Sequence, residues 1–139
     1  MSPSAANRAI ELHDSFLAVL EATGDRVRVV FEPGYVHETQ GVPGLDPGTG
    51  LLQTIELFVE SGSIEGALTA LPFDVSDGTL TIDGQIYSNL LPLPMNRRGN
   101  IELKLLLKSS DCVVIRGAGI TTGFEGLPED AEDFPGVRS

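Results

Sequence analysis

The chain has 139 residues, which is a usual size for one domain, and 41% of them are hydrophobic. It carries 20 acidic residues against 9 basic ones, so its formal net charge is −11. This charge disfavours binding to nucleic acid or to an anionic membrane, because both need clustered lysine and arginine. It suits a basic protein partner or a cation, and it also keeps a protein soluble.

The sequence predicts an N-terminal tail over residues 1–9, one β domain over 10–124 and a partly disordered acidic tail over 125–139. No segment reaches the roughly 20 apolar residues of a membrane span, and the start lacks the apolar stretch of a signal peptide. Cys112 is the only cysteine, so no intramolecular disulfide can form. These features predict a cytoplasmic protein. Because Cys112 opens an apolar run, it is predicted to be buried and inert.

Short segments in which apolar and polar residues alternate predict β-strands, since successive side chains on a strand point to opposite faces. Residues 12–21 and 26–31 are expected to form the first hairpin, joined by a turn at 22–25. The Pro-Gly pair at 33–34 interrupts the second strand and predicts a bulge, a bend or a strand end. Residues 41–50 contain four glycines and two prolines, which is typical of a structured loop.

Further strands are expected at 52–60, 67–75, 79–82, 85–88, 101–108 and 113–122. The Asp-Gly pair at 83–84 lies between two alternating runs and predicts a type I′ hairpin turn. Residues 89–95 are apolar but contain two prolines, so they are expected to cover one end of the core rather than to form a central strand. Residues 76–78 and 96–100 are predicted turns. Seven or eight strands without a strong helix predict an all-β fold, either a single antiparallel β-sandwich or a small β-barrel.

The strand predicted at 101–108 alternates cleanly, which indicates that Leu103 and Leu105 face the core. Leu106 falls on the otherwise charged face of this strand. A patch made by Leu106, Phe58 and Val114 on the outer face would mark an interaction surface. On this basis the sequence predicts a symmetric homodimer.

Several segments resemble a group of small bacterial β proteins of unassigned function. They are LHDS at 12–15, DPGTG at 46–50 followed by Gln53, residues 78–94 with the run YSNLLPLP, and EDF at 132–134. The similarity covers most of the chain. It implies a shared β fold and makes Gln53 a candidate binding residue, but it implies no catalytic motif. The pattern departs at 121–123, where Thr-Thr-Gly replaces longer apolar residues.

His13 and His37 are the only histidines, and both fall near the open end of the predicted first hairpin. With Asp14 or Glu38 they would supply nitrogen and oxygen ligands that suit zinc or another divalent metal, although metal sites usually show closer spacing. Ordinary hydrogen-bonded histidines are the alternative. The His-Asp-Ser run at 13–15 does not predict a catalytic triad, because adjacent side chains on a strand face opposite ways. We therefore predict no cofactor and no metal requirement for folding.

Arg97 and Arg98 form the only adjacent basic pair. They are candidates for binding a carboxylate or phosphate, and a solvated turn is the alternative. The chain shows neither a convergent acid–base set nor a cofactor motif, which favours a non-enzymatic domain that binds a protein or ligand. An immunity or inhibitor protein with a basic partner fits the acidic charge. The alternative is a small hydrolase or isomerase that uses His13, His37 and carboxylates in a barrel mouth.

Overall fold

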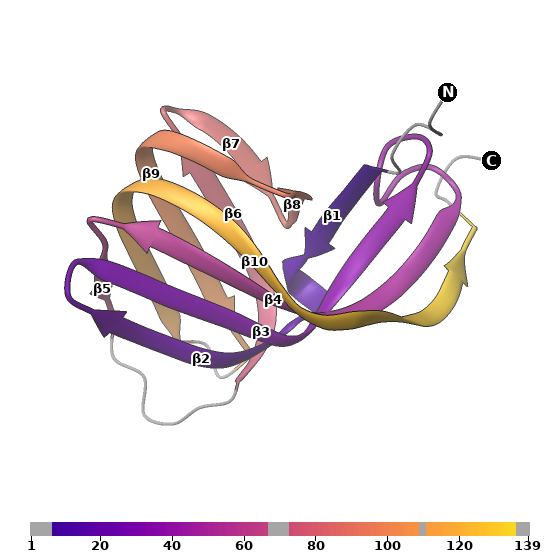
Figure 1. Ribbon diagram of the computed structural model, residues 1–139, viewed down its shortest axis with the longest axis horizontal. Coiled ribbons are helices and arrows are strands. Elements are labelled where there is room, and N and C mark those ends of the chain that lie inside the picture. Colours follow the sequence, from indigo (N-terminus) through magenta and orange to yellow (C-terminus); the bar gives the residue numbers. More distant parts are fainter. Residues whose placement is uncertain (1–6, 67–72, 109–110, 136–139) are drawn as a thin grey trace.

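The computed structural model describes residues 7–66, 73–108 and 111–135 (Figure 1). Nearly all of these residues lie in strands, which confirms the all-β class. The elements in chain order are β1 (Asn7–Glu11), the 3-10 turn η1 (Leu12–Asp14), β2 (Phe16–Thr23), β3 (Arg26–Thr39), β4 (Gly48–Glu60), β5 (Ser63–Glu65), β6 (Phe73–Ile82), β7 (Gln85–Ser88), β8 (Leu90–Leu93), β9 (Asn96–Leu107) and β10 (Cys112–Phe134).

Six strands close into an antiparallel ring in the order β2-β6-β9-β10-β4-β3, with β3 pairing back to β2. Ring closure gives each of these strands a neighbour on both sides, so it shortens the exposed edges that an open sheet would have. The seam between β2 and β6 is short and consists of the pairs Phe16↔Asp74 and Leu17↔Phe73. Of the two architectures predicted, the molecule therefore adopts the barrel-like one.

The second halves of β3 and β10 and the first half of β4 extend beyond this ring. With β1 and β8 they form a second sheet in the order β8-β1-β3-β4-β10 (Figure 1). The change of direction in β3 coincides with the predicted bulge, because the register shifts between Phe31 and Gly34. Gly34 has a packing reason as well. A Cβ atom there would lie 2.9 Å from Ile10 Cδ1 and 3.0 Å from Ile55 Cγ1.

The ring is filled by apolar side chains that alternate along its strands. Leu103 and Leu105 are fully buried, as predicted. Their inward neighbours come from all parts of the ring and include Leu17, Val29, Phe31, Leu57, Leu80 and Ile115. The core therefore holds the barrel together from within, and the second sheet adds Ile10, Val36 and Leu91 to it.

Two predicted hairpins are confirmed. The first joins β2 and β3 through Gly24 and Asp25. The second joins β6 and β7 through Asp83 and Gly84, whose φ angles of 49° and 84° are those that a type I′ turn requires. The apolar segment after β7 forms β8, which pairs with β1 alone among the described strands, so Pro92 lies on an edge as its missing N–H demands.

Residues 12–14 were expected in a strand, and they form the turn η1 instead. Residues 76–78 were a predicted turn, yet they continue β6 and pair with β9 across a register shift between Val75 and Asp77. Here the glycine serves packing, because a Cβ on Gly78 would run into the side chain of Leu12. Pairing with neighbouring strands thus outweighs the local turn composition.

The segment 96–100 was also a predicted turn, and it opens β9 in the ladder with β10. Residues 125–134 were expected in a partly disordered tail but form the second half of β10, paired with β4. β1 begins at Asn7, within the segment predicted as the N-terminal tail. Residues 67–72, part of one predicted strand, lie outside the described residues. Among the described residues, no helix has the length and hydrophobicity to cross a membrane.

Candidate functional site

A short turn fixes three polar side chains at the end of β1. The backbone N–H of Leu12 donates to the backbone oxygen of Asn89, and that of His13 donates to Asn89 Oδ1, both at 2.8 Å. The Ser15 hydroxyl closes the turn by donating a 2.7 Å bond to the backbone oxygen of Glu11. Leu12 is buried, so the turn places His13 and Asp14 on the solvent side.

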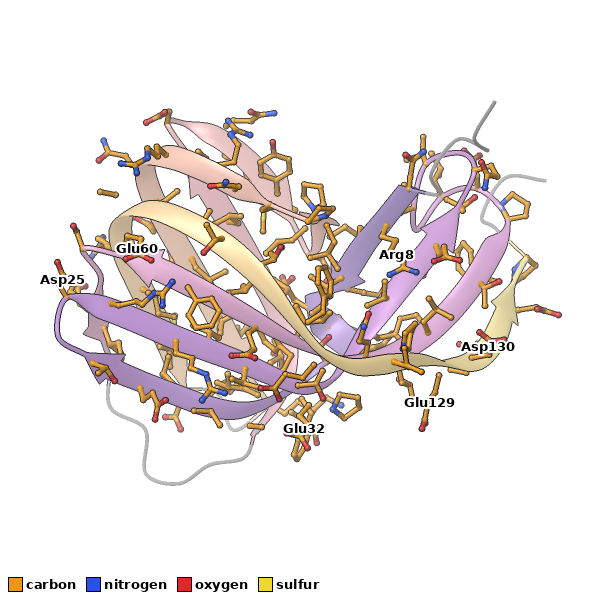
Figure 2. All side chains as sticks on the ribbon, viewed as in Figure 1. Arg8, Asp25, Glu32, Glu60, Glu129 and Asp130 are labelled. Carbon is orange, nitrogen blue, oxygen red and sulfur yellow. The ribbon has the colours of Figure 1, made fainter. Side chains whose placement is uncertain are left out.

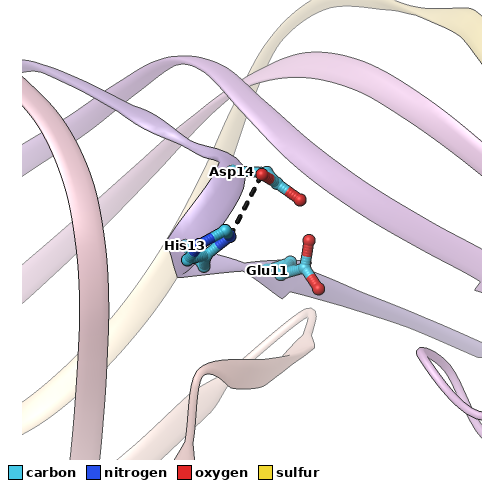
Figure 3. A group of neighbouring side chains, drawn as sticks. All are labelled: Glu11, His13 and Asp14. Carbon is cyan, nitrogen blue, oxygen red and sulfur yellow. Dashed lines mark hydrogen bonds and ion pairs between the residues drawn. The ribbon is translucent and has the colours of Figure 1, made fainter.

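Glu11, His13 and Asp14 converge on one space at this turn (Figure 3). One ligand atom from each of the three lies within 4.8 Å of the others. His13 Nδ1 and Asp14 Oδ1 lie 3.1 Å apart. Neighbouring residues can meet in this way because the chain turns, whereas on the strand expected from the sequence they would have faced opposite sides.

His37 lies on β3 beside this cluster and is only 4% exposed. Its ring packs edge-on against Tyr35 and Phe134, with centroid distances of 5.1 Å and 4.8 Å. Its cross-strand partners are the small residues Ala9 and Gly50, which leave room for the three rings. Neither ring nitrogen of His37 has a hydrogen-bond partner among the described residues.

Glu11 connects the two histidines. Its Oε1 atom lies 3.5 Å from Nε2 of His37, a distance at which the two would form an ion pair if the imidazole is protonated. The imidazole of His37 lowers the pKa of the Glu11 carboxyl, against the opposing effect of burial. The Glu11 carboxyl in turn raises the pKa of Asp14.

His13, Asp14 and His37 were predicted from the sequence as site residues, whereas Glu11 was not. Glu11 stands two residues before His13, and such a Glu-x-His-Asp run is a signal only if the chain bends at Leu12. Glu38, a predicted ligand, does not join the cluster. It points to the opposite face of β3 and accepts a 2.6 Å hydrogen bond from Arg8 Nε. Of the two carboxylates predicted beside the histidines, only Asp14 is in the cluster, and the predicted role of Glu38 in binding stays a prediction.

Gln53 lies on β4 away from the histidines. Its side-chain N–H donates a 3.2 Å hydrogen bond to the backbone oxygen of Gly126, and its Oε1 has no partner among the described residues. This bond links β4 to the bend of β10 between Glu125 and Glu129. Gln53 thus supports the strand pairing, and its predicted role in binding stays a prediction.

Arg97 and Arg98 line a surface pocket of about 410 Å³, which Arg26 and Glu60 also line. Arg26 Nε donates a 2.8 Å hydrogen bond to Glu60, and its guanidinium lies 4.3 Å above the Phe58 ring. Within the described residues, neither Arg97 nor Arg98 has a carboxylate partner. The pocket therefore has an excess of positive charge, and the predicted binding of a carboxylate or phosphate there stays a prediction.

Cys112 is exposed, so the prediction of a buried thiol is wrong. Val113 and Ile115 occupy the inner face of β10, and the two-residue period then turns Cys112 and Val114 outward. Leu106 pairs with Cys112 and is 43% exposed.

The predicted apolar patch is smaller than expected. Val114 pairs with Lys104, which is two residues from Leu106 on β9, so Val114 and Leu106 are diagonal neighbours on the same face. Phe58 pairs with Thr121, seven residues farther along β10, which corresponds to about 23 Å of strand. Phe58 therefore does not join the other two.

The second half of β10 is an acidic edge. Residues 125–134 include no basic residue and five exposed acidic ones, which are Glu125, Glu129, Asp130, Glu132 and Asp133. In the described structure this half pairs with β4 on one side only. Figure 2 shows Glu129 and Asp130 pointing away from the ribbon, at the opposite end of the molecule from Asp25.

Comparisons of this chain with protein-family models, with curated proteins and with solved structures found no match. The resemblance of its segments to small bacterial β proteins stays a prediction.

Proposed function

We propose that this chain is a non-enzymatic binding domain, of immunity or inhibitor type, whose partner is a protein with a basic segment. The observation that carries the proposal is the acidic edge of β10, defined as residues 125–134. It presents five exposed carboxylates along a strand whose other side is unpaired in the described structure. The partner segment would lie along this edge with its lysines and arginines toward the carboxylates.

Charge complementarity explains how such an edge would select its partner. Carboxylates on successive residues of a strand are closer together than the screening length of about 8 Å in physiological salt, so their fields add. Such a field speeds encounter with a basic surface and repels an acidic one. The edge also keeps its charge nearly uncompensated, since Arg28 Nη2 lies 3.9 Å from Glu125 and the other four carboxylates form no ion pair with a basic side chain within the described residues.

The alternative function, a small hydrolase or isomerase in a barrel mouth, receives less support. Such a site needs both histidines at the mouth of the ring. Here His13 belongs to the turn before β2, and His37 belongs to the part of β3 that has left the ring. The interior of the ring is occupied by apolar side chains.

The proposal can be tested with a labelled peptide of alternating lysine and valine, whose binding is followed by fluorescence anisotropy at low and at physiological salt. We expect binding that weakens as salt rises. The double variant Glu129→Lys/Asp130→Lys should bind at least tenfold more weakly. The matched control is Asp25→Lys/Asp74→Lys, which changes the net charge equally at exposed positions on the barrel and should lose less than twofold.

An equal loss in both double variants would show that only the net charge matters and would overturn the assignment to β10. Failure of the unaltered protein to bind the peptide would do the same. A third outcome also contradicts the proposal. If Glu129→Lys/Asp130→Lys leaves peptide binding intact but makes the protein self-associate, the carboxylates serve to guard an edge strand against aggregation.

A further inference from the structure

The cluster of Glu11, His13 and Asp14 has the composition of a metal site. One imidazole nitrogen and two carboxylates match the borderline preference of zinc and similar transition metals. Calcium and magnesium favour sites made of oxygen atoms alone. Among the described residues this is the one group of three such side chains whose ligand atoms lie this close together.

The spacing of the ligand atoms fits a tetrahedral ion. Two ligands of one zinc ion lie about 3.4 Å apart when each bond is about 2.0–2.1 Å long. The observed 3.1 Å between His13 Nδ1 and Asp14 Oδ1 is close to this value, and the 4.8 Å limit on the remaining separations leaves small rotations to complete the site. Side chains that are half exposed, at 55% for His13 and 51% for Asp14, make such rotations easily.

The backbone beneath these side chains is already fixed. Asn89 accepts hydrogen bonds from two successive N–H groups of the turn, and Ser15 closes it from the other side. Leu12 anchors the turn in the core. A site whose backbone is held in place before the ion arrives loses little conformational entropy on binding.

His37 gives an independent indication of a ligand. It is 96% buried, both of its ring nitrogens lack a hydrogen-bond partner within the described residues, and Nε2 faces Glu11 Oε1 at 3.5 Å. Buried polar groups without partners are costly and rare in folded proteins. Carboxylates that bind metal ions are usually held by a hydrogen bond from a neighbouring residue. A neutral His37 is placed to donate that bond from the buried side of Glu11.

We propose that Glu11, His13 and Asp14 bind one divalent transition-metal ion of the zinc type, and that His37 positions Glu11 as the donor behind it. The three ligands leave a fourth coordination position on the solvent side of the turn, where His13 and Asp14 are exposed. The site does not depend on the acidic edge of β10, so the two proposals can fail separately.

The test uses the full chain without a histidine tag, stripped with EDTA and titrated with zinc chloride by calorimetry. We expect one zinc per chain, and cobalt chloride should give the visible absorption of a nitrogen- and oxygen-bound ion. Glu11→Gln and His13→Ala should each weaken zinc binding at least tenfold. Glu38→Gln is the matched control, because it removes a carboxylate from the opposite face of β3, and it should change affinity less than twofold.

The role of His37 needs a separate readout. His37→Phe fills the same space between Tyr35 and Phe134 and should weaken zinc binding about tenfold, as loss of a supporting hydrogen bond does. It should also shift the cobalt spectrum. His37→Gln restores an N–H donor and should recover part of the affinity. A structural role alone would move the melting temperature but not the spectrum.

Two results would overturn the proposal. One is zinc affinity that is unchanged in His13→Ala, a variant at an exposed position that is expected to fold. The other is magnesium binding as tight as zinc binding. EDTA alone should leave the melting temperature unchanged, as the sequence predicted, whereas added zinc should raise it because the ion binds only the folded chain.

Discussion

The hydroxyl of Tyr35 donates a 2.6 Å hydrogen bond to Oε1 of Glu132, a residue 97 positions later in the chain. The bond spans β4 at Gly50, where a side chain would collide with the tyrosine ring. The bond ties β3 to the second half of β10, and the Tyr35 ring packs against one side of His37. Burial, together with the neighbouring Glu132 carboxylate, raises the pKa of Tyr35, so the hydroxyl keeps its proton and remains a donor.

Tyr35→Phe should remove this bond while keeping the ring. We expect a loss of about 1 kcal/mol in the free energy of unfolding, together with faster amide exchange in residues 129–134. Tyr87→Phe is the control, since the Tyr87 hydroxyl has only a 3.4 Å contact with Arg97. Equal exchange rates in the two variants would mean that Tyr35 does not hold the second half of β10.

Leu103→Ala and Leu105→Ala should each lower the free energy of unfolding by about 2–5 kcal/mol, because both side chains are fully buried and leave cavities. Leu106→Ala on the same strand should cost less than about 1 kcal/mol, since this leucine is 43% exposed. Urea unfolding of the three variants provides the measurement. Similar losses at positions 105 and 106 would contradict the observed alternation.

Acid should weaken the link between β3 and β4. A hydrogen bond from Arg28, at 2.8 Å, lowers the pKa of the Glu56 carboxyl in the folded state. A lowered folded pKa contributes stability above the unfolded value of about 4.3, and this contribution is lost as the pH falls through the folded pKa. Glu56→Gln should therefore cost about 1 kcal/mol at neutral pH and less below pH 4. Unfolding free energies measured across this range would refute the assignment if the cost stayed constant.

The homodimer predicted from the sequence can be tested at Leu106, which lies on the outer face beside Cys112. Light scattering of concentrated protein in a reducing buffer should give the mass of two chains. Leu106→Lys should shift the mass toward the monomer without changing the circular dichroism spectrum. Cys112→Ser controls for a disulfide between the exposed thiols, and a monomer mass for the unaltered protein would contradict the prediction.

The local predictions succeeded where a short pattern has one physical outcome. The alternation around Leu103 and Leu105 has a period of two, and only one phase buries the leucines. Asp83 and Gly84 tolerate the positive φ angles of a tight hairpin, and they form one. The prediction of a buried Cys112 was wrong. Whether the first residue of β10 faces the core or the solvent depends on how β10 pairs with β9, and the apolar run at 112–115 does not contain that information.

The candidate site was only partly predictable. Two histidines and Asp14 stood out as the residue types that bind metals. Their relation through Glu11 depends on the bend at Leu12 and on the pairing of β1 with β3. The bend is fixed by Asn89, 77 positions after Leu12 in the chain, so no window of sequence around His13 contains its cause.

The sequence by itself determined the all-β class, the two tight hairpin turns and the inward faces of the clean strands, because these follow from side-chain period and backbone sterics within a few residues. The tertiary structure alone decided the closure of the ring, the second sheet and the meeting of Glu11 with His37. Strand pairing minimises the exposed apolar surface and the unpaired backbone of the whole chain at once, and a local pattern does not record which distant strand achieves this.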